Sequence, residues 1–416
     1  METQRCKGSR DLLPEDMAKF RHIEHVFRSS CLGWGYEEIR TPTLEYLHLF
    51  TSVGTLTPEM LSRVYSFLDW DGWSGERVVL RPDGTIPAAR LYIENLAGVR
   101  PARLFYVENV FTFEETGRES RERWQCGAEI VGSARPLADV ELIALALDVL
   151  DKLGIQGVRL HLSHAGVIAS LLARLGLTSA EQAEAFNRIL AGNSESLRDL
   201  IGAAPQLKDA VSLLFEVKGE SAGYLRNLQA LLGRPSPDPD LDASMNDFIA
   251  IADSLTGLRH EYEIDIATGK GFEYYTGIIF RFYLDGRVLG GGGRYDGLVP
   301  LLGGGAVPAS GFALRIDRLM EHIAAWEEVK PSVLVRSEVD GTAVVPLCFE
   351  VAALLRKAGH AVELDQGYTG PTAHRWVVSL QGTAASPRFA VADRASGATV
   401  QADSPAQVVE AVGKCS

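Results

Sequence analysis

The chain has 416 residues, and its 41 Lys and Arg against 54 Asp and Glu give a net charge of −13. This balance argues against a protein that mainly coats nucleic acid, because binding to phosphates needs a basic surface. Hydrophobic residues make up 46% and charged residues 23%, as is usual for a soluble globular protein, and the length predicts two or three domains. The start of the chain lacks the apolar segment of a signal peptide, and no apolar run could span a membrane. We therefore expect a cytoplasmic protein.

The residue types that build metal and phosphate sites are present without the spacing those sites need. The five cysteines are widely separated and include no CxxC pair, which favours a reducing compartment over a disulfide scaffold. The glycine runs at 290–293 and 303–305 lack the spacing of a phosphate loop, and His260-Glu261 lacks the second histidine of a zinc-protease motif. We expect no metal site and no cofactor.

Apolar spacing and turn residues predict the following elements in chain order: a helix at 14–31, strands at 37–42, 77–81, 103–113 and 125–131, a helix at 137–153, a strand at 158–162, a helical insertion at about 178–258, strands at 262–266 and 278–283, a hairpin turn at Asp285-Gly286, and a helix at 316–326. A composition shift near Pro331 then predicts a boundary. Residues 331–416 predict a small α/β domain with strands at 333–335, 361–364 and 389–392 and helices at 351–357 and 407–412.

The functional signal is concentrated in five segments, which occur in this order: Lys7-Gly8-Ser9-Arg10-Asp11-Leu12-Leu13-Pro14, Leu80-Arg81-Pro82-Asp83-Gly84-Thr85, Phe111 to Glu129, Gly271-Phe272-Glu273-Tyr274-Tyr275-Thr276-Gly277, and Gly292 to Leu319. Each segment alone is weak evidence, since a tyrosine pair on a strand is more often core than binding site. Together they resemble the catalytic core of the class II aminoacyl-tRNA synthetases, and within them the histidyl-tRNA synthetase branch.

This resemblance implies an α+β fold, with a mostly antiparallel sheet flanked by helices over residues 1–330 and a helical insertion at about 178–258. It implies that residues 331–416 form a shortened relative of an anticodon-binding domain. It also implies a homodimer, formed through the region of the N-terminal helix and Pro42.

The nucleotide site of the family is altered at the positions that handle phosphate. Thr112 stands where the family has an arginine, and Lys270 replaces a second catalytic arginine with a point charge rather than a planar fork. Arg315 stands where the family has a small residue, on the floor of the nucleotide site, while Arg318 is kept. Stabilising negative charge at a phosphate needs fixed cationic donors, so we expect no catalytic residues in this chain.

The amino-acid pocket of the family is largely kept, with an aspartate in place of a family glutamate, at Asp83, Thr85, Gln125, Glu129, Tyr274, Tyr275 and Tyr295. We expect Glu129 and Asp83 to pair with the ammonium of a weakly bound histidine, and Gln125 and the tyrosine hydroxyls to orient the rest of the ligand. The alternative is that these residues are inherited scaffold.

A core that keeps the amino-acid pocket and loses the nucleotide site resembles the regulatory subunits of ATP phosphoribosyltransferase. That resemblance implies a non-catalytic protein that works with a short catalytic subunit in the first step of histidine biosynthesis. A divergent histidyl-tRNA synthetase is the alternative. Residues 331–416 carry seven Lys and Arg against eight Asp and Glu, a net of −1, which is a poor surface for tRNA.

Overall fold

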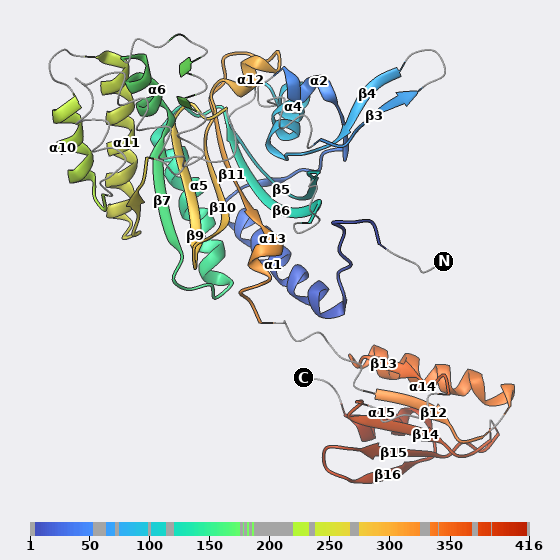
Figure 1. Ribbon diagram of the computed structural model, residues 1–416. Helices are drawn as coiled ribbons and strands as arrows, with labels where there is room; N and C mark the ends of the chain where they lie inside the picture. The colour runs from blue at the N-terminus through green and yellow to red at the C-terminus, as the bar shows by residue number, and fades with distance from the viewer. Residues whose placement is uncertain are drawn as a thin grey trace. The chain divides into compact units, whose positions relative to one another are not determined.

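A computed structural model describes residues 5–52, 64–70, 75–98, 101–113, 120–174, 178, 181–182, 185–186, 219–232, 238–266, 274–324, 333–339, 341–367, 373–383 and 385–413. The chain divides into two compact units, Met1–Ala325 and Trp326–Ser416, each with a hydrophobic core of its own (Figure 1). The expected boundary at 330 and most of the first half of the expected insertion lie outside the described residues. Among the helices that are described, none is both long and apolar enough to cross a membrane.

Within the described residues, the larger unit is built on an eight-stranded sheet with the order β1-β5-β6-β11-β10-β9-β7-β8. The strands are β1 Glu37–Glu38, β5 Ala102–Phe111, β6 Glu122–Val131, β7 Arg159–His164, β8 Glu263–Ile264, β9 Ile278–Leu284, β10 Arg287–Arg294 and β11 Ala309–Arg315. Neighbours are antiparallel except at the two edges, where β1 pairs with β5 and β8 with β7 in parallel. The expected α+β class is confirmed.

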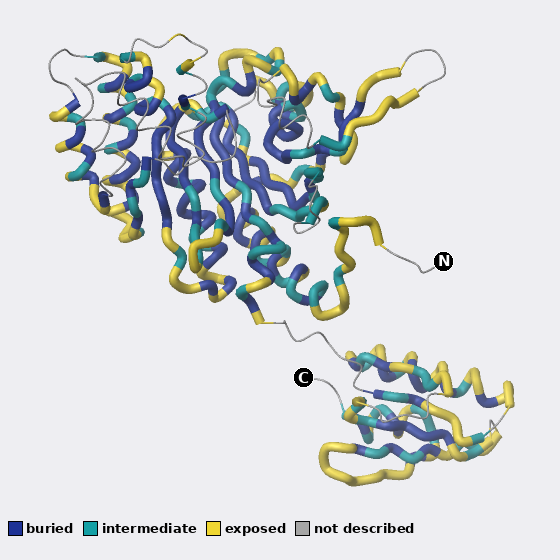
Figure 2. Tube along the Cα trace, in the orientation of Figure 1, coloured by how far each residue is buried: buried dark blue, intermediate teal, exposed yellow. Residues whose placement is uncertain are grey.

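Two long helices, α1 Pro14–Gly33 and α5 Pro136–Lys152, belong to the same core as one face of this sheet. Side chains alternate along a strand, so Cys126, Ala128 and Ile130 of β6 contribute to that core. Helix α1 begins at Pro14 with acidic residues in its first turn, as expected, because proline suits the first helical position and carboxylates suit the positive end of the helix dipole. The strands at the centre of the sheet are buried (Figure 2).

The β7 edge of the core is covered by three more helices, α6 Ala165–Ala173, α10 Ala222–Leu232 and α11 Pro239–Gly257. Helices α10 and α11 lie side by side next to β7 (Figure 1). They fall in the second half of the expected insertion. Their buried apolar residues recur every three to four positions, as at Leu241, Met245 and Phe248, which is the spacing of a helix and not of a strand.

A second, smaller core includes residues of α2 Leu47–Thr51, α4 Thr85–Asn95 and α12 Leu298–Leu301. Beside it lies a three-stranded sheet in the order β2-β4-β3, formed by β2 Leu44–Tyr46, β4 Gly75–Leu80 and β3 Ser66–Trp70. The β3–β4 ribbon extends away from the main sheet and is exposed along β3 (Figures 1 and 2).

Two local expectations can be compared directly with the structure. The hairpin turn at Asp285-Gly286 is confirmed between β9 and β10, with φ of 49° and 76°, as a two-residue turn of this kind requires. The helix expected at 316–326 was too long, because α13 covers only Ile316–Leu319. The amides of Glu321 and His322 donate to the carbonyls three residues earlier, so the chain closes in tight turns instead of continuing the helix.

The smaller unit contains a five-stranded sheet in the order β13-β12-β14-β15-β16. Its elements are β12 Val333–Ser337, α14 Val345–Lys357, β13 Val362–Leu364, β14 Trp376–Leu380, β15 Phe389–Asp393, β16 Thr399–Ala402 and α15 Pro405–Val412. Strand β12 pairs in parallel with β13 and β14, whereas β14, β15 and β16 are antiparallel. Valines and leucines of the sheet and both helices share one core.

Candidate functional site

Glu129 lies near the C-terminal end of β6, on the sheet face opposite α1 and α5, since its neighbours Ala128 and Ile130 point into the α1–α5 core. Its partner across the ladder on β11 is Gly311. A Cβ atom at residue 311 would lie 1.5 Å from Glu129 Oε2, so only glycine leaves room for the carboxyl group. The glycine in the segment Gly311-Phe312-Ala313 is therefore explained by the side chain across from it.

Both carboxyl oxygens of Glu129 accept hydrogen bonds from neutral hydroxyls. Oε1 accepts from Thr85 Oγ1 at 2.9 Å and from the Tyr106 hydroxyl at 3.0 Å, while Oε2 accepts from the Tyr295 hydroxyl. The side chain is 1% exposed. Burial raises the pKa of Glu129 to about 8, against the opposing effect of the three hydroxyls. The protonated form therefore predominates at pH 7.

Asp83 precedes α4 and caps its first turn, with Oδ2 accepting from the Ile86 amide at 3.1 Å. Burial raises the pKa of Asp83, while the backbone amides of residues 84–86 act in the opposite direction. A helix N-terminus favours a carboxylate. Asp83 thus has a local structural role in addition to its expected one.

Among the three expected tyrosines, Tyr274 packs against both of the others. The Tyr274 ring lies 5.3 Å from that of Tyr275 and 5.5 Å, edge to face, from that of Tyr295. Burial raises the pKa of all three hydroxyls. They therefore stay protonated at neutral pH and can donate hydrogen bonds, as Tyr295 does to Glu129.

Tyr106 completes the network around Glu129, although no motif in the sequence marks it as a site residue. It lies across the β5–β6 ladder from Gly127, and a Cβ there would come within 2.2 Å of the Tyr106 ring. Tyr106 can be recognised as a site residue only once β5 is known to pair with β6, and motif spacing does not show which strands pair.

The seven expected pocket residues divide into two groups. Gln125 and Tyr275 line a cavity of about 190 Å³ over β6, β9, β10 and β11. The other five form the buried network below and beside it, at Asp83, Thr85, Glu129, Tyr274 and Tyr295. Gln125 Nε2 is buried and has no hydrogen-bond partner within the described part of the chain.

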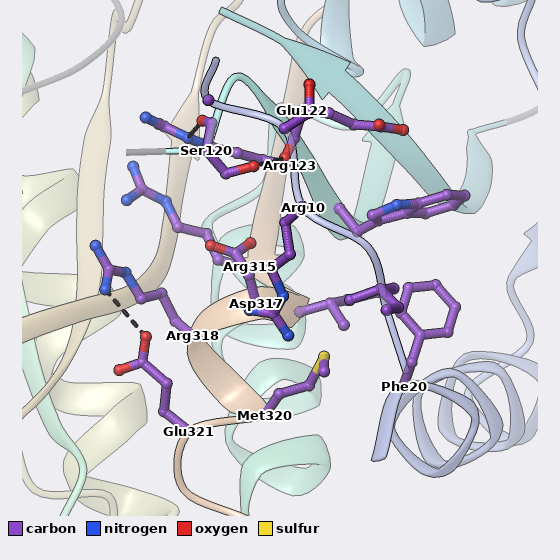
Figure 3. Close-up of a pocket in the computed structure, with 15 residues that line it drawn as sticks. Arg10, Phe20, Ser120, Glu122, Arg123, Arg315, Asp317, Arg318, Met320 and Glu321 are labelled. Atoms are coloured by element: carbon purple, nitrogen blue, oxygen red, sulfur yellow. Dashed lines mark hydrogen bonds and ion pairs between the residues drawn. The ribbon is translucent and has the colours of Figure 1, made fainter. Parts of the chain in front are cut away.

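The residues expected in the altered nucleotide site lie close by. Thr112 and Arg315 line the same cavity as Gln125, and Arg315 lies directly across the β6–β11 ladder from Gln125. Arg318 lines an adjoining cavity of about 390 Å³ that also includes Arg315 (Figure 3). Lys270 lies outside the described residues.

Two motif arginines serve the fold. Arg294 forms an ion pair at 2.7 Å with the buried Asp139 of α5 and also donates to the Ser133 carbonyl. Arg81 pairs with Glu108 at 2.8 Å, and both side chains are buried. The first pair joins β10 to α5, and the second joins the residue after β4 to β5. The motif residues Arg81 and Arg294 therefore stabilise the strands around the site. In the described ranges, no group of three or more His, Cys, Asp and Glu side chains could hold a metal ion.

A family model described as histidyl-tRNA synthetase matches residues 8–319. An ATP phosphoribosyltransferase regulatory subunit of Dehalococcoides mccartyi (strain ATCC BAA-2266 / KCTC 15142 / 195) is 49% identical over 97% of both chains. The chain belongs to the histidyl-tRNA synthetase family, on the branch of these regulatory subunits. The histidine–tRNA ligase of Methanocaldococcus jannaschii is 32% identical over 87% of this chain and 86% of the ligase.

Solved structures agree with this family assignment. A Bacillus halodurans C structure described as an ATP phosphoribosyltransferase regulatory subunit/histidyl-tRNA synthetase has a TM-score of 0.76 at 25% identity and covers 88% of this chain and 94% of its own. The apo histidyl-tRNA synthetase of S. aureus has a TM-score of 0.66 at 22% identity, covers 98% and 99%, and shows the shared fold. These structures share the fold of this chain.

Proposed function

We propose that this chain is the non-catalytic regulatory subunit of an ATP phosphoribosyltransferase, and that it acts with a short catalytic subunit in the first step of histidine biosynthesis, in the cytoplasm. The observation that carries the proposal is the near-full-length similarity to proteins of that name, which extends through the small C-terminal unit. The ligases match a smaller share of the chain at lower identity.

The cavity residues support the absence of synthetase chemistry. Thr112 reaches the cavity with a hydroxyl instead of a guanidinium, and it cannot bind a phosphate as a bidentate donor. Arg315 occupies the cavity wall where the synthetases have a small residue. A nucleotide that fits the synthetase site would meet a bulky cation here.

The proposed assembly has two kinds of contact, one between copies of this chain and one with the catalytic subunit. The small sheet that follows Pro42 supports the homodimer, because its edge strand β3 exposes Phe67, Leu68 and Trp70. Exposed apolar edge strands are sites of pairing with another chain. The net charge of −1 on residues 331–416 supports a protein partner rather than tRNA.

The buried network supports weak binding of histidine as a finer proposal. In its ionised form, Glu129 can accept a hydrogen bond beyond the three that it has, since a carboxylate offers about four acceptor positions. An ammonium beside it would favour the ionised form and offset part of the cost of burial. The unpartnered Gln125 amide could then donate to the ligand's carboxylate.

Co-expression with a short catalytic subunit tests the proposal. We expect the two chains to co-elute as one hetero-oligomer, and the purified chain to show no histidine-dependent exchange of pyrophosphate into ATP. Separate elution together with pyrophosphate exchange would instead identify a divergent histidyl-tRNA synthetase.

A further inference from the structure

The cavity beside Gln125 owes its shape to a row of small residues across the sheet. Gly127 of β6 pairs with Ala313 of β11, Ala313 pairs with Gly291 of β10, and Gly291 pairs with Arg281 of β9. Residues paired across a ladder lie on the same face. Because the first three residues of this row are small, they leave space above the sheet. Arg281, on β9, is the last residue of the row and lines that space.

Three arginines line this cavity, and each comes from a different strand: Arg123 from β6, Arg281 from β9 and Arg315 from β11. The described lining residues include no carboxylate. The other lining side chains with polar atoms are Thr112, Trp124, Gln125 and Tyr275, all of which can donate a hydrogen bond. The described lining thus combines positive charge with neutral donors.

Two of these cations, Arg281 and Arg315, lack an ionic partner within the described part of the chain. Burial lowers the pKa of Arg315, and its neighbours Arg123, Arg318 and Arg281 lower it further, while Asp317 acts in the opposite direction. Guanidiniums held together in this way repel one another unless an anion lies between them.

The adjoining cavity, which shares Arg123 and Arg315, has a different character. Four arginines line it, but three carboxylates, Glu122, Asp317 and Glu321, line it too. Figure 3 shows Arg318 turned toward Glu321, its partner at 3.1 Å, while Arg315 points away from that pair. The excess positive charge is therefore on the side of Gln125.

We propose that the cavity between Arg123, Arg281 and Arg315 binds a phosphate-bearing anion, recognised through its phosphate groups and not through a nucleobase. Arginine forks match phosphate oxygens, and the amide of Gln125 adds a neutral donor. The volume of about 190 Å³ suits a phosphate or pyrophosphate group and lies below the roughly 300–1,000 Å³ of pockets that take drug-sized ligands. Arg315 stands where the synthetases have a small residue, so this part of the cavity wall differs from theirs.

The test uses calorimetry on the full chain with inorganic pyrophosphate, inorganic phosphate, tripolyphosphate and ATP. The variants are Arg315→Gln and Arg281→Gln, and the matched control is Arg226→Gln, which removes an exposed arginine of α10. We expect pyrophosphate to bind, each cavity variant to weaken it about tenfold or more, and the control to leave it unchanged. ATP should bind no more tightly than tripolyphosphate.

A melting measurement keeps the test independent of folding defects. Removing one of several neighbouring cations should raise the melting temperature of the Arg315→Gln chain without ligand, and pyrophosphate should then stabilise it less than the unmodified chain. Absence of pyrophosphate binding at millimolar concentration, or equal binding by Arg315→Gln, would overturn the proposal. ATP binding more than about tenfold tighter than tripolyphosphate would overturn it as well, because the base would then be read.

Discussion

The most specific expectation from the structure concerns the replacement Glu129→Gln. In the folded chain the pKa of Glu129 is raised from 4.5 to about 8, mainly by burial. Between these two values the folded state holds a proton that the unfolded chain has released. Stability must therefore fall as the pH rises from 4.5 to 8.

The size of the effect follows from the difference of 8 − 4.5 = 3.5 pKa units. At about 1.4 kcal/mol per unit, ionising Glu129 costs the fold about 5 kcal/mol above pH 8. A glutamine carries no charge in this range. Its carbonyl can accept from Thr85 and Tyr106, and its amide can donate to the Tyr295 oxygen, so the network survives.

The assay is denaturant unfolding of both chains between pH 5 and pH 8.5, followed on the transition of the larger unit. The free energy of unfolding of the glutamine variant relative to the unmodified chain should rise across this window by several kcal/mol. The control is Glu122→Gln, on the same strand with an exposed side chain, which should show no comparable trend. A difference between Glu129→Gln and the unmodified chain that stays constant with pH would refute the reasoning.

Further outcomes follow from the same contacts. If histidine places its ammonium beside Glu129, binding ionises the carboxyl group, so affinity should rise about tenfold per pH unit up to about pH 8 and lose this dependence in Glu129→Gln. Calorimetry in two buffers of different ionisation heat would detect the released proton, and a pH-independent affinity would argue that the ligand lies elsewhere. Asp139→Ala should cost about 3 kcal/mol in unfolding experiments, because it leaves the buried Arg294 with only the more exposed Asp296 as an ionic partner. The exposed pair on the same helix is the comparison, and Asp148→Ala should cost at most about 1 kcal/mol; equal losses from both variants would contradict this account.

The sequence predicts the parts of the fold whose signal is local. Strands β5 and β9 are rich in large apolar residues, and the β9–β10 turn has the residue pair that such hairpins need. Strand β11 was not predicted, because Gly311 and Ala313 are small for reasons that lie on other strands. Strand β14 was also missed, although it is the central partner of both β12 and β15 in the smaller unit.

The candidate site shows the same division between local and non-local signal. The motifs predicted Thr112 and Arg315 in a nucleotide site and Gln125 in an amino-acid pocket, and the structure has all three lining one cavity. Arg281 could not be found in this way. It lies in an apolar strand, and its role depends on the small residues Gly291 and Ala313 that lie beside it in the ladder.

The central claim, a regulatory subunit without catalysis of its own, is tested most directly by one activity measurement. ATP phosphoribosyltransferase turnover is measured for the purified short catalytic subunit, for this chain, and for the two mixed. The account predicts no turnover from this chain, low turnover from the catalytic subunit, and a marked rise on mixing that saturates with a fixed stoichiometry. Turnover of the catalytic subunit that is the same with and without this chain would contradict it.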